Sequence, residues 1–68
     1  MTSASAVSYL QTVAHERGLG LELLPNGLIR VFDRQSKLSA CFDGETGAYR
    51  HGGLRAVDLH DAIFGHWA

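Results

Sequence analysis

The stretch LGLELLPNGLIRVFD, residues 19–33, places apolar side chains on both sides of the triplet Pro25-Asn26-Gly27. Two apolar runs that flank such a turn sequence are typical of a β-hairpin. A two-residue Asn26-Gly27 turn would leave Pro25 on a strand. A three-residue loop instead places Pro25 at the second position of a type I turn, which suits its fixed φ, and Gly27 in the left-handed conformation. We therefore expect the three-residue loop.

The length of this loop determines the strand register, and with it the face on which each side chain lies. The three-residue loop produces four cross-strand pairs: Leu24 with Leu28, Leu23 with Ile29, Glu22 with Arg30, and Leu21 with Val31. One face of the hairpin is then aliphatic, and we expect it to face the core: Leu21, Leu23, Ile29 and Val31. The opposite face is mixed, with an expected Glu22–Arg30 ion pair, and carries Glu22, Leu24, Leu28, Arg30 and Phe32.

Two further strands are expected, and each follows a turn sequence rich in Asp, Gly and polar residues. The turn DRQSK (33–37) precedes LSACFD (38–43), and the turn DGETG (43–47), with Gly47 at positive φ, precedes AYRH (48–51). Alternation predicts three core residues in the first of these strands: Leu38, Ala40 and Phe42. Ser39, Cys41 and Asp43 should point the other way. The last strand should pair Phe42 with Tyr49 and Cys41 with Arg50, before Gly52-Gly53 ends the sheet.

Helical periodicity marks both ends of the chain. Residues 3–18 predict one helix, which Thr2, Ser3 or Ser5 would cap and Gly18 would end. Its expected core residues are Ala6, Val7, Leu10, Val13 and Ala14. Residues 54–67 predict a second helix, with Ala56, Val57, Leu59, Ala62, Ile63, Phe64 and Trp67 in its apolar stripe.

Together these segments predict an α+β fold of two layers: helix, four-stranded antiparallel meander, helix, with both helices on one sheet face. With 68 residues, the chain is expected to be a single domain, residues 1–68. A chain of this length buries only about 60% of its unfolded surface. Oligomerisation would supplement so small a core.

Composition argues against several classes of protein. The net charge is −1 with only six Lys and Arg residues, whereas a purely electrostatic nucleic-acid binder is normally more basic. The single cysteine, Cys41, cannot form an internal disulfide, which favours the reducing cytoplasm. The N-terminal stretch has no basic leader and no long apolar core, so we expect neither a signal peptide nor a membrane span.

Three of the four histidines, His51, His60 and His66, lie near Asp58 and Asp61. His60 and His66 are six residues apart, which places them about 120° apart around a helix, whereas helical metal ligands share a face at a spacing of three or four. Asp58 and Asp61 share a face near the start of the helix, where carboxylates suit the helix dipole. We therefore expect neither a metal site nor a cofactor.

The face opposite the predicted core is the strongest functional feature of the sequence. We call it the outer sheet face, and define it by seven residues: Glu22, Leu24, Leu28, Arg30, Phe32, Cys41 and Arg50. An aromatic ring flanked by arginines is a common composition at the centre of a protein interface. Between Arg30 and Arg50, Cys41 is either a thiol activated by two cations or a small packing residue.

These features predict a small non-enzymatic interaction module. It would bind a protein partner, or a second copy of itself, through the outer sheet face centred on Phe32 and Arg30. The alternative is a single-stranded nucleic-acid binder that stacks bases on the same face. A third hypothesis is redox or enzymatic activity at Cys41.

Overall fold

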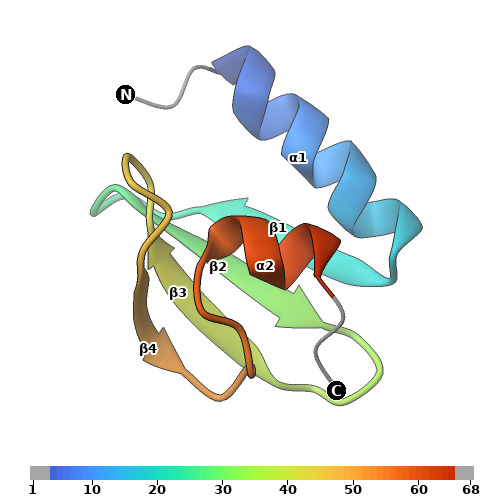
Figure 1. Cartoon of the computed structure of the whole chain (residues 1–68). Helices are drawn as coiled ribbons and strands as arrows, with labels where there is room; N and C mark the ends of the chain where they lie inside the picture. Colours follow the sequence, from blue (N-terminus) through green and yellow to red (C-terminus); the bar gives the residue numbers. More distant parts are fainter. Residues whose placement is uncertain (1–3, 66–68) are drawn as a thin grey trace.

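The computed structural model of the chain describes residues 4–65, with side chains described from Val7 onward. Its elements are, in chain order, α1 (Ala4–Glu16), β1 (Leu19–Leu23), β2 (Leu28–Asp33), β3 (Ser39–Asp43), β4 (Tyr49–Gly52) and α2 (Leu59–Phe64) (Figure 1). The strands form one antiparallel sheet in the order β1-β2-β3-β4. The predicted α+β class and the order helix, meander, helix are confirmed.

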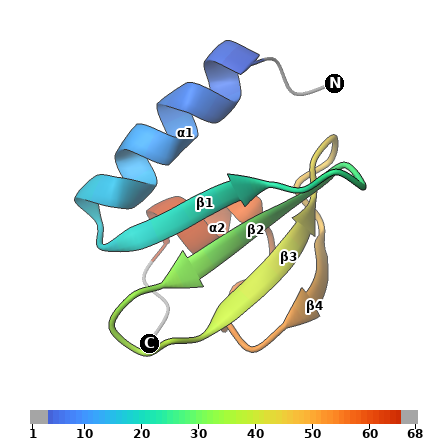
Figure 2. The same cartoon turned by 180° about the vertical axis from the view of Figure 1, so that it is seen from behind.

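Side chains from both helices and from one sheet face form a common buried cluster. Its buried members are Ala14, Leu19, Ile29, Val31, Ala40, Phe42, Leu54, Leu59, Ala62 and Ile63. In Figures 1 and 2, α2 crosses the middle of the sheet and α1 runs beside β1. Seen from behind, in Figure 2, no described helix lies in front of the sheet. Residues 4–65 therefore leave the second face of the sheet bare of helices.

The β1–β2 hairpin has the predicted register and the predicted three-residue loop. Leu21 pairs with Val31, and the pairs on either side of this one follow the same register. The Leu24 N–H donates to the Leu28 carbonyl at 2.8 Å, and the Gly27 N–H donates to the Leu24 carbonyl at 3.1 Å. Gly27 has φ +86°, the left-handed conformation that this loop requires.

The two turns that follow are near copies of each other. In each, the N–H of the leading aspartate, Asp33 or Asp43, donates at 2.8 Å to the carbonyl five residues later. The fifth residue of each turn, Lys37 or Gly47, has a positive φ of 66° or 78°. Each aspartate side chain also accepts the backbone N–H two residues ahead. The turns are therefore the same local structure built twice, ten residues apart along the chain.

The prediction that Leu23 and Leu38 belong to the core is wrong. Leu23 is 55% exposed and Leu38 is 46% exposed. Leu23 is the last residue of the edge strand β1, and Leu38 precedes the first residue of β3. Because α2 has only six residues, it does not extend over the strand ends, and the alternation that placed these side chains on the core face does not bury them.

The register of β4 is confirmed at one pair and wrong at the next. Phe42 pairs with Tyr49 as predicted, and the two rings meet edge to face at 6.0 Å. Cys41, however, pairs with His51, because the register shifts between Cys41 and Phe42 and leaves Arg50 as the extra residue of a β-bulge.

Gly52 does not end the sheet as predicted but belongs to β4. It pairs with Ala40 and has φ +133°. A Cβ at this position would lie 2.3 Å from the Ala40 Cα, so only glycine lets the two backbones approach this closely. The glycine therefore extends the pairing by one residue beyond its predicted end.

The second helix is much shorter than the predicted 54–67. Asp58 is its N-cap, in an extended conformation, and its side chain accepts the Asp61 N–H at 2.8 Å. The Asp61 side chain in turn accepts the Val57 N–H at 3.1 Å. Asp58 therefore caps the helix, and Asp61 binds the N–H of the residue before the cap, instead of the two carboxylates sharing a helix face. Val57, which was placed in the apolar stripe, is 78% exposed.

The remaining helical predictions divide between confirmed residues and undescribed ones. Val7 and Ala14 are buried, as are Leu59, Ala62 and Ile63. Gly18, with φ +75°, follows the end of α1 as predicted. The predictions on Thr2, Ser3, His66 and Trp67, and on the side chains of Ser5 and Ala6, lie outside the described part of the chain.

Candidate protein interface on the outer sheet face

The central row of the outer sheet face crosses all four strands. The pairing places Glu22, Arg30, Cys41 and His51 side by side. Arg30 donates to the Glu22 carboxylate at 3.4 Å, which confirms the predicted cross-strand ion pair. Both side chains stay largely open to solvent, so this pair contributes little to stability and remains available to a partner.

Phe32 lies one row along β2, between two small residues. Its neighbours across the sheet are Gly20 on β1 and Ser39 on β3. The Arg30 guanidinium carbon lies 5.7 Å from the centre of the Phe32 ring, a cation–π contact. The ring is half-buried on this platform and presents its remaining surface to solvent.

The other end of the outer sheet face is aliphatic with a charged margin. Leu24 and Leu28 meet at the start of the hairpin loop, and both are half-buried. Leu28 pairs with Asp43 on β3. The Asp43 carboxylate lies 3.6 Å from the Arg50 guanidinium, which forms a second ion pair on the β3–β4 side.

Cys41 occupies the centre of this face but is only 8% exposed. Its neighbours are Arg30 on β2 and His51 on β4, so the prediction that Arg50 lies beside it is wrong. Reactive thiols are usually accessible to solvent. The low exposure therefore favours the packing role of Cys41 over the reactive one.

The outer sheet face is mixed rather than openly apolar. The large apolar side chains with the highest exposure lie elsewhere: Tyr9, Leu23, Leu38, Tyr49 and Val57. On the outer sheet face, Arg30 lies over Phe32, and Leu24 and Leu28 are both half-buried. Its two arginines and the two carboxylates that pair with them, Glu22 and Asp43, cancel in charge.

The sequence did not predict the roles of two residues on this surface, Asp43 and His51. Asp43 follows Cys41 at the spacing of two that puts it on the same face, but its partner Arg50 depends on the bulge. His51 enters the central row for the same reason. Alternation along a strand carries no signal for a bulge, because a bulge is a break in that alternation.

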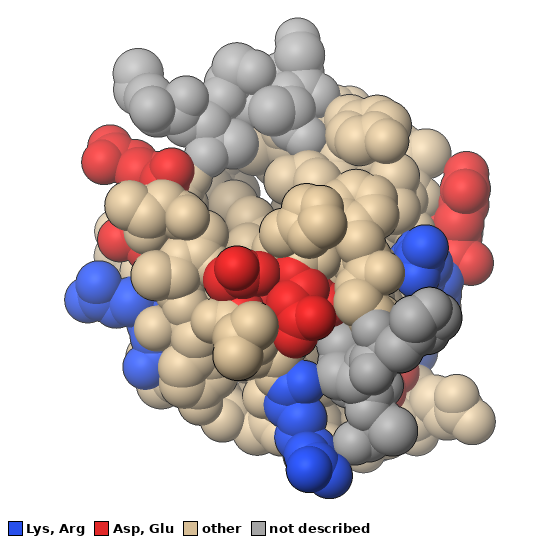
Figure 3. All heavy atoms as spheres, in the orientation of Figure 1, with Lys and Arg blue, Asp and Glu red and all other residues tan. Residues whose placement is uncertain are grey.

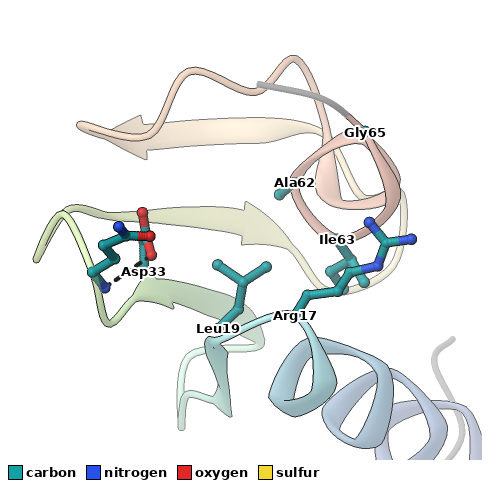
Figure 4. A pocket seen from close by; sticks show the side chains of 7 residues that line it. Arg17, Leu19, Asp33, Ala62, Ile63 and Gly65 are labelled. Atoms are coloured by element: carbon teal, nitrogen blue, oxygen red, sulfur yellow. Dashed lines mark hydrogen bonds between the residues drawn. The ribbon is translucent and has the colours of Figure 1, made fainter. Parts of the chain in front are cut away.

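The helix side of the molecule carries a small pocket of about 210 Å³ (Figure 4). In Figure 4, Arg17 and Asp33 lie on opposite sides of it, with Leu19 between them, and Ala62 and Ile63 form the α2 side. Gly65, the last described residue, also lines it. Within residues 4–65, no three His, Cys, Asp or Glu side chains are grouped as ligands for a metal ion.

Neither described helix has the length and apolar composition needed to cross a bilayer. No protein-family model matches the chain, and no curated protein or solved structure matches it either.

Proposed function

We propose that this chain is a small non-enzymatic interaction module of the cytoplasm that binds a protein partner, or a second copy of itself, through the outer sheet face. The observation that carries the proposal is the Phe32–Arg30 pair on a sheet face that no described helix covers. Aromatic residues and arginine are enriched at the centres of protein interfaces, where they supply most of the binding energy.

The size of the face bears on the strength of the complex. The Cα atoms span 29 × 23 × 19 Å, so a rectangle around the largest face of the whole molecule measures 29 × 23 = 667 Å², below the about 800 Å² that one side of a standard interface buries. A stable partner would have to cover nearly the whole outer sheet face. Contacts over part of the face would give a weak and transient complex.

Single-stranded nucleic-acid binding is less well supported by the same residues. Arg30 and Arg50 would have to neutralise phosphates, but each lies beside a carboxylate, Glu22 or Asp43. Fluorescence anisotropy with short oligonucleotides at pH 7.5 tests this alternative. Binding that weakens steeply with salt and with Arg30→Ala or Arg50→Ala would favour it over the protein interface.

Redox or enzymatic activity at Cys41 has a separate test. It predicts that Cys41 is alkylated at neutral pH faster than a model thiol. Because the thiol is 8% exposed, we expect slow alkylation that accelerates only on unfolding.

Light scattering coupled to size exclusion, over a range of concentrations, tests the proposed interface. Phe32→Asp places a charge at its centre, so we expect the variant to stay monomeric and folded by circular dichroism. Tyr9→Asp is the control, because Tyr9 is exposed on α1 and lies off the sheet. If wild type and Phe32→Asp are both monomers, Phe32→Asp should instead abolish capture of a protein partner. Loss of the Phe32→Asp fold, or equal loss of association in both variants, would contradict the proposal.

A further inference from the structure

A groove lies on the helix side of the molecule, between α1, the β3–β4 turn and α2. It has a volume of about 290 Å³, near the lower limit of small-ligand sites. Its apolar lining comes from Leu10, Leu59 and Phe64, and its polar lining includes Glu45, Asp58 and His60. We call it the acidic groove and define it by these six residues.

The wall of the acidic groove is held in place by backbone hydrogen bonds. The Leu59 N–H donates to the Gly47 carbonyl at 2.7 Å, and Ala48 forms a β-bridge with Asp58. These contacts join the β3–β4 turn to the start of α2. The backbones of Glu45 and Asp58 therefore belong to two segments that hydrogen bonds join to each other.

The groove combines an apolar floor with a negative rim. Among the described residues that line it there are two carboxylates and neither Lys nor Arg. In Figure 3, acidic side chains lie over the start of α2 near the centre of the view, and others lie over the β3–β4 turn at the left. The ring of His60 packs on Phe64, with centroids 4.8 Å apart, which extends the apolar surface of the floor.

We propose that the acidic groove binds a lysine side chain of a partner protein. The methylene stem would lie on Leu10, Leu59 and Phe64, because lysine stems pack on apolar surfaces while their charged ends stay at the rim. The ammonium would then reach the carboxylates of Glu45 and Asp58, where charge-assisted hydrogen bonds form. The groove lies on the helix side, away from the outer sheet face, and the proposal does not depend on that face.

A titration monitored by ¹⁵N–¹H NMR tests this site with three capped peptides. Acetyl-Gly-Lys-Gly-amide is the probe, and its norleucine counterpart keeps the stem but lacks the ammonium. Its glutamate counterpart carries the opposite charge. At low salt we expect saturable shifts of the Thr46, Gly47, Leu59 and His60 amides with the lysine peptide. The norleucine peptide should bind more weakly, and the glutamate peptide should not bind.

Charge removal at the rim supplies the matched variants. Glu45→Gln with Asp58→Asn removes both carboxylates, and asparagine still caps α2. We expect the affinity for the lysine peptide to fall about threefold or more, the usual size of two exposed charge contacts. Glu16→Gln with Asp33→Asn removes the same charge outside both the groove and the outer sheet face, and should leave the affinity unchanged.

Three results would overturn the proposal: equal binding of the glutamate peptide, an equal loss in the control variant, or no saturable shift at millimolar peptide. Phe32→Asp separates this site from the outer sheet face. That variant should keep the lysine-peptide titration even if it abolishes association through the sheet.

Discussion

At the scale of single residues, Gly52 is the position at which the backbone demands one amino acid. Its φ is +133°, and a Cβ would lie 2.3 Å from the Ala40 Cα and 2.5 Å from the Ser39 carbonyl oxygen. Both obstacles are backbone atoms, which cannot move aside as the end of a side chain can. Any larger residue must therefore break the pairing of β4 with β3.

We predict that Gly52→Ala lowers the free energy of unfolding by about 2 kcal/mol or more, because it adds both a clash and backbone strain. Urea denaturation followed by circular dichroism measures the change. Gly53→Ala is the control, since its Cβ would meet only the tip of Leu38, at 3.4 Å, and its φ is not positive. Equal losses in the two variants would contradict the prediction, because they would show that a side chain at position 52 has no particular cost.

The cap of α2 is a second determinant at this scale. The Asp58 side chain accepts the Asp61 N–H, which has no carbonyl partner inside the helix. We predict that Asp58→Ala costs about 1 kcal/mol of unfolding free energy, while Asp58→Asn is nearly neutral. Thermal unfolding of the two variants checks this. A large loss for Asp58→Asn would contradict this prediction and mean that the charge of Asp58 matters to stability. Glu45→Gln alone would then be the variant that tests lysine binding at the groove.

At the scale of elements, the two Asp turns share one electrostatic device. Hydrogen bonds from the Ser36 hydroxyl and the Gln35 N–H hold the pKa of Asp33 below its ordinary value. The N–H groups of residues 45 and 46 do the same for the pKa of Asp43, and Arg50 adds a smaller effect. In both turns, donors that point at the carboxylate favour its charged form.

The sign of the pH dependence follows from these lowered pKa values. The unfolded chain binds protons more readily than the folded one, so the turns stabilise the fold above about pH 4 and lose this contribution as the pH falls further. We predict that Asp33→Asn with Asp43→Asn flattens the loss of stability in acid. Urea denaturation at several pH values between 2 and 6 measures this, with Glu16→Gln and Glu22→Gln as the charge-matched control. An unchanged slope in the double Asn variant would contradict the prediction.

At the scale of the whole molecule, the core is small and every buried side chain is a large fraction of it. Stability of about 0.05–0.15 kcal/mol per residue implies a total of only several kcal/mol for a chain of this length. Ile63 is 1% exposed and lies in the cluster that joins α2 to the sheet. Removing its side chain therefore threatens the fold itself.

We predict that Ile63→Ala lowers the unfolding free energy by about 2–5 kcal/mol, enough to leave much of the protein unfolded at 37 °C. Val57→Ala, at a position that is 78% exposed, should change it little. Thermal melts at several protein concentrations measure both effects. If melting temperatures rise with concentration, association adds to the stability of the small core. A small loss for Ile63→Ala would show that the core collapses around the missing side chain.

Much of the sheet could be predicted from the sequence, because its determinants are local. Pro25 and Gly27 accept only certain backbone angles, and this sets the loop, the register of β1 with β2 and the Glu22–Arg30 pair. The same alternation placed Phe32 and Cys41 on the outer sheet face. The composition of the candidate interface was therefore largely predictable, except for His51 and for the ion pair between Asp43 and Arg50.

The sequence by itself determined the order of elements, the first hairpin and the two faces of the strands, because turn chemistry and the two-residue period of a strand act between near neighbours. Only the tertiary structure decided how far each face is covered. Leu23 and Leu38 are exposed because the six-residue α2 does not cover them, whereas Cys41 is buried on the other face among its neighbours in the sheet. It also decided the bulge that pairs Cys41 with His51, since that register depends on the close approach of Gly52 to Ala40, twelve residues away in the chain.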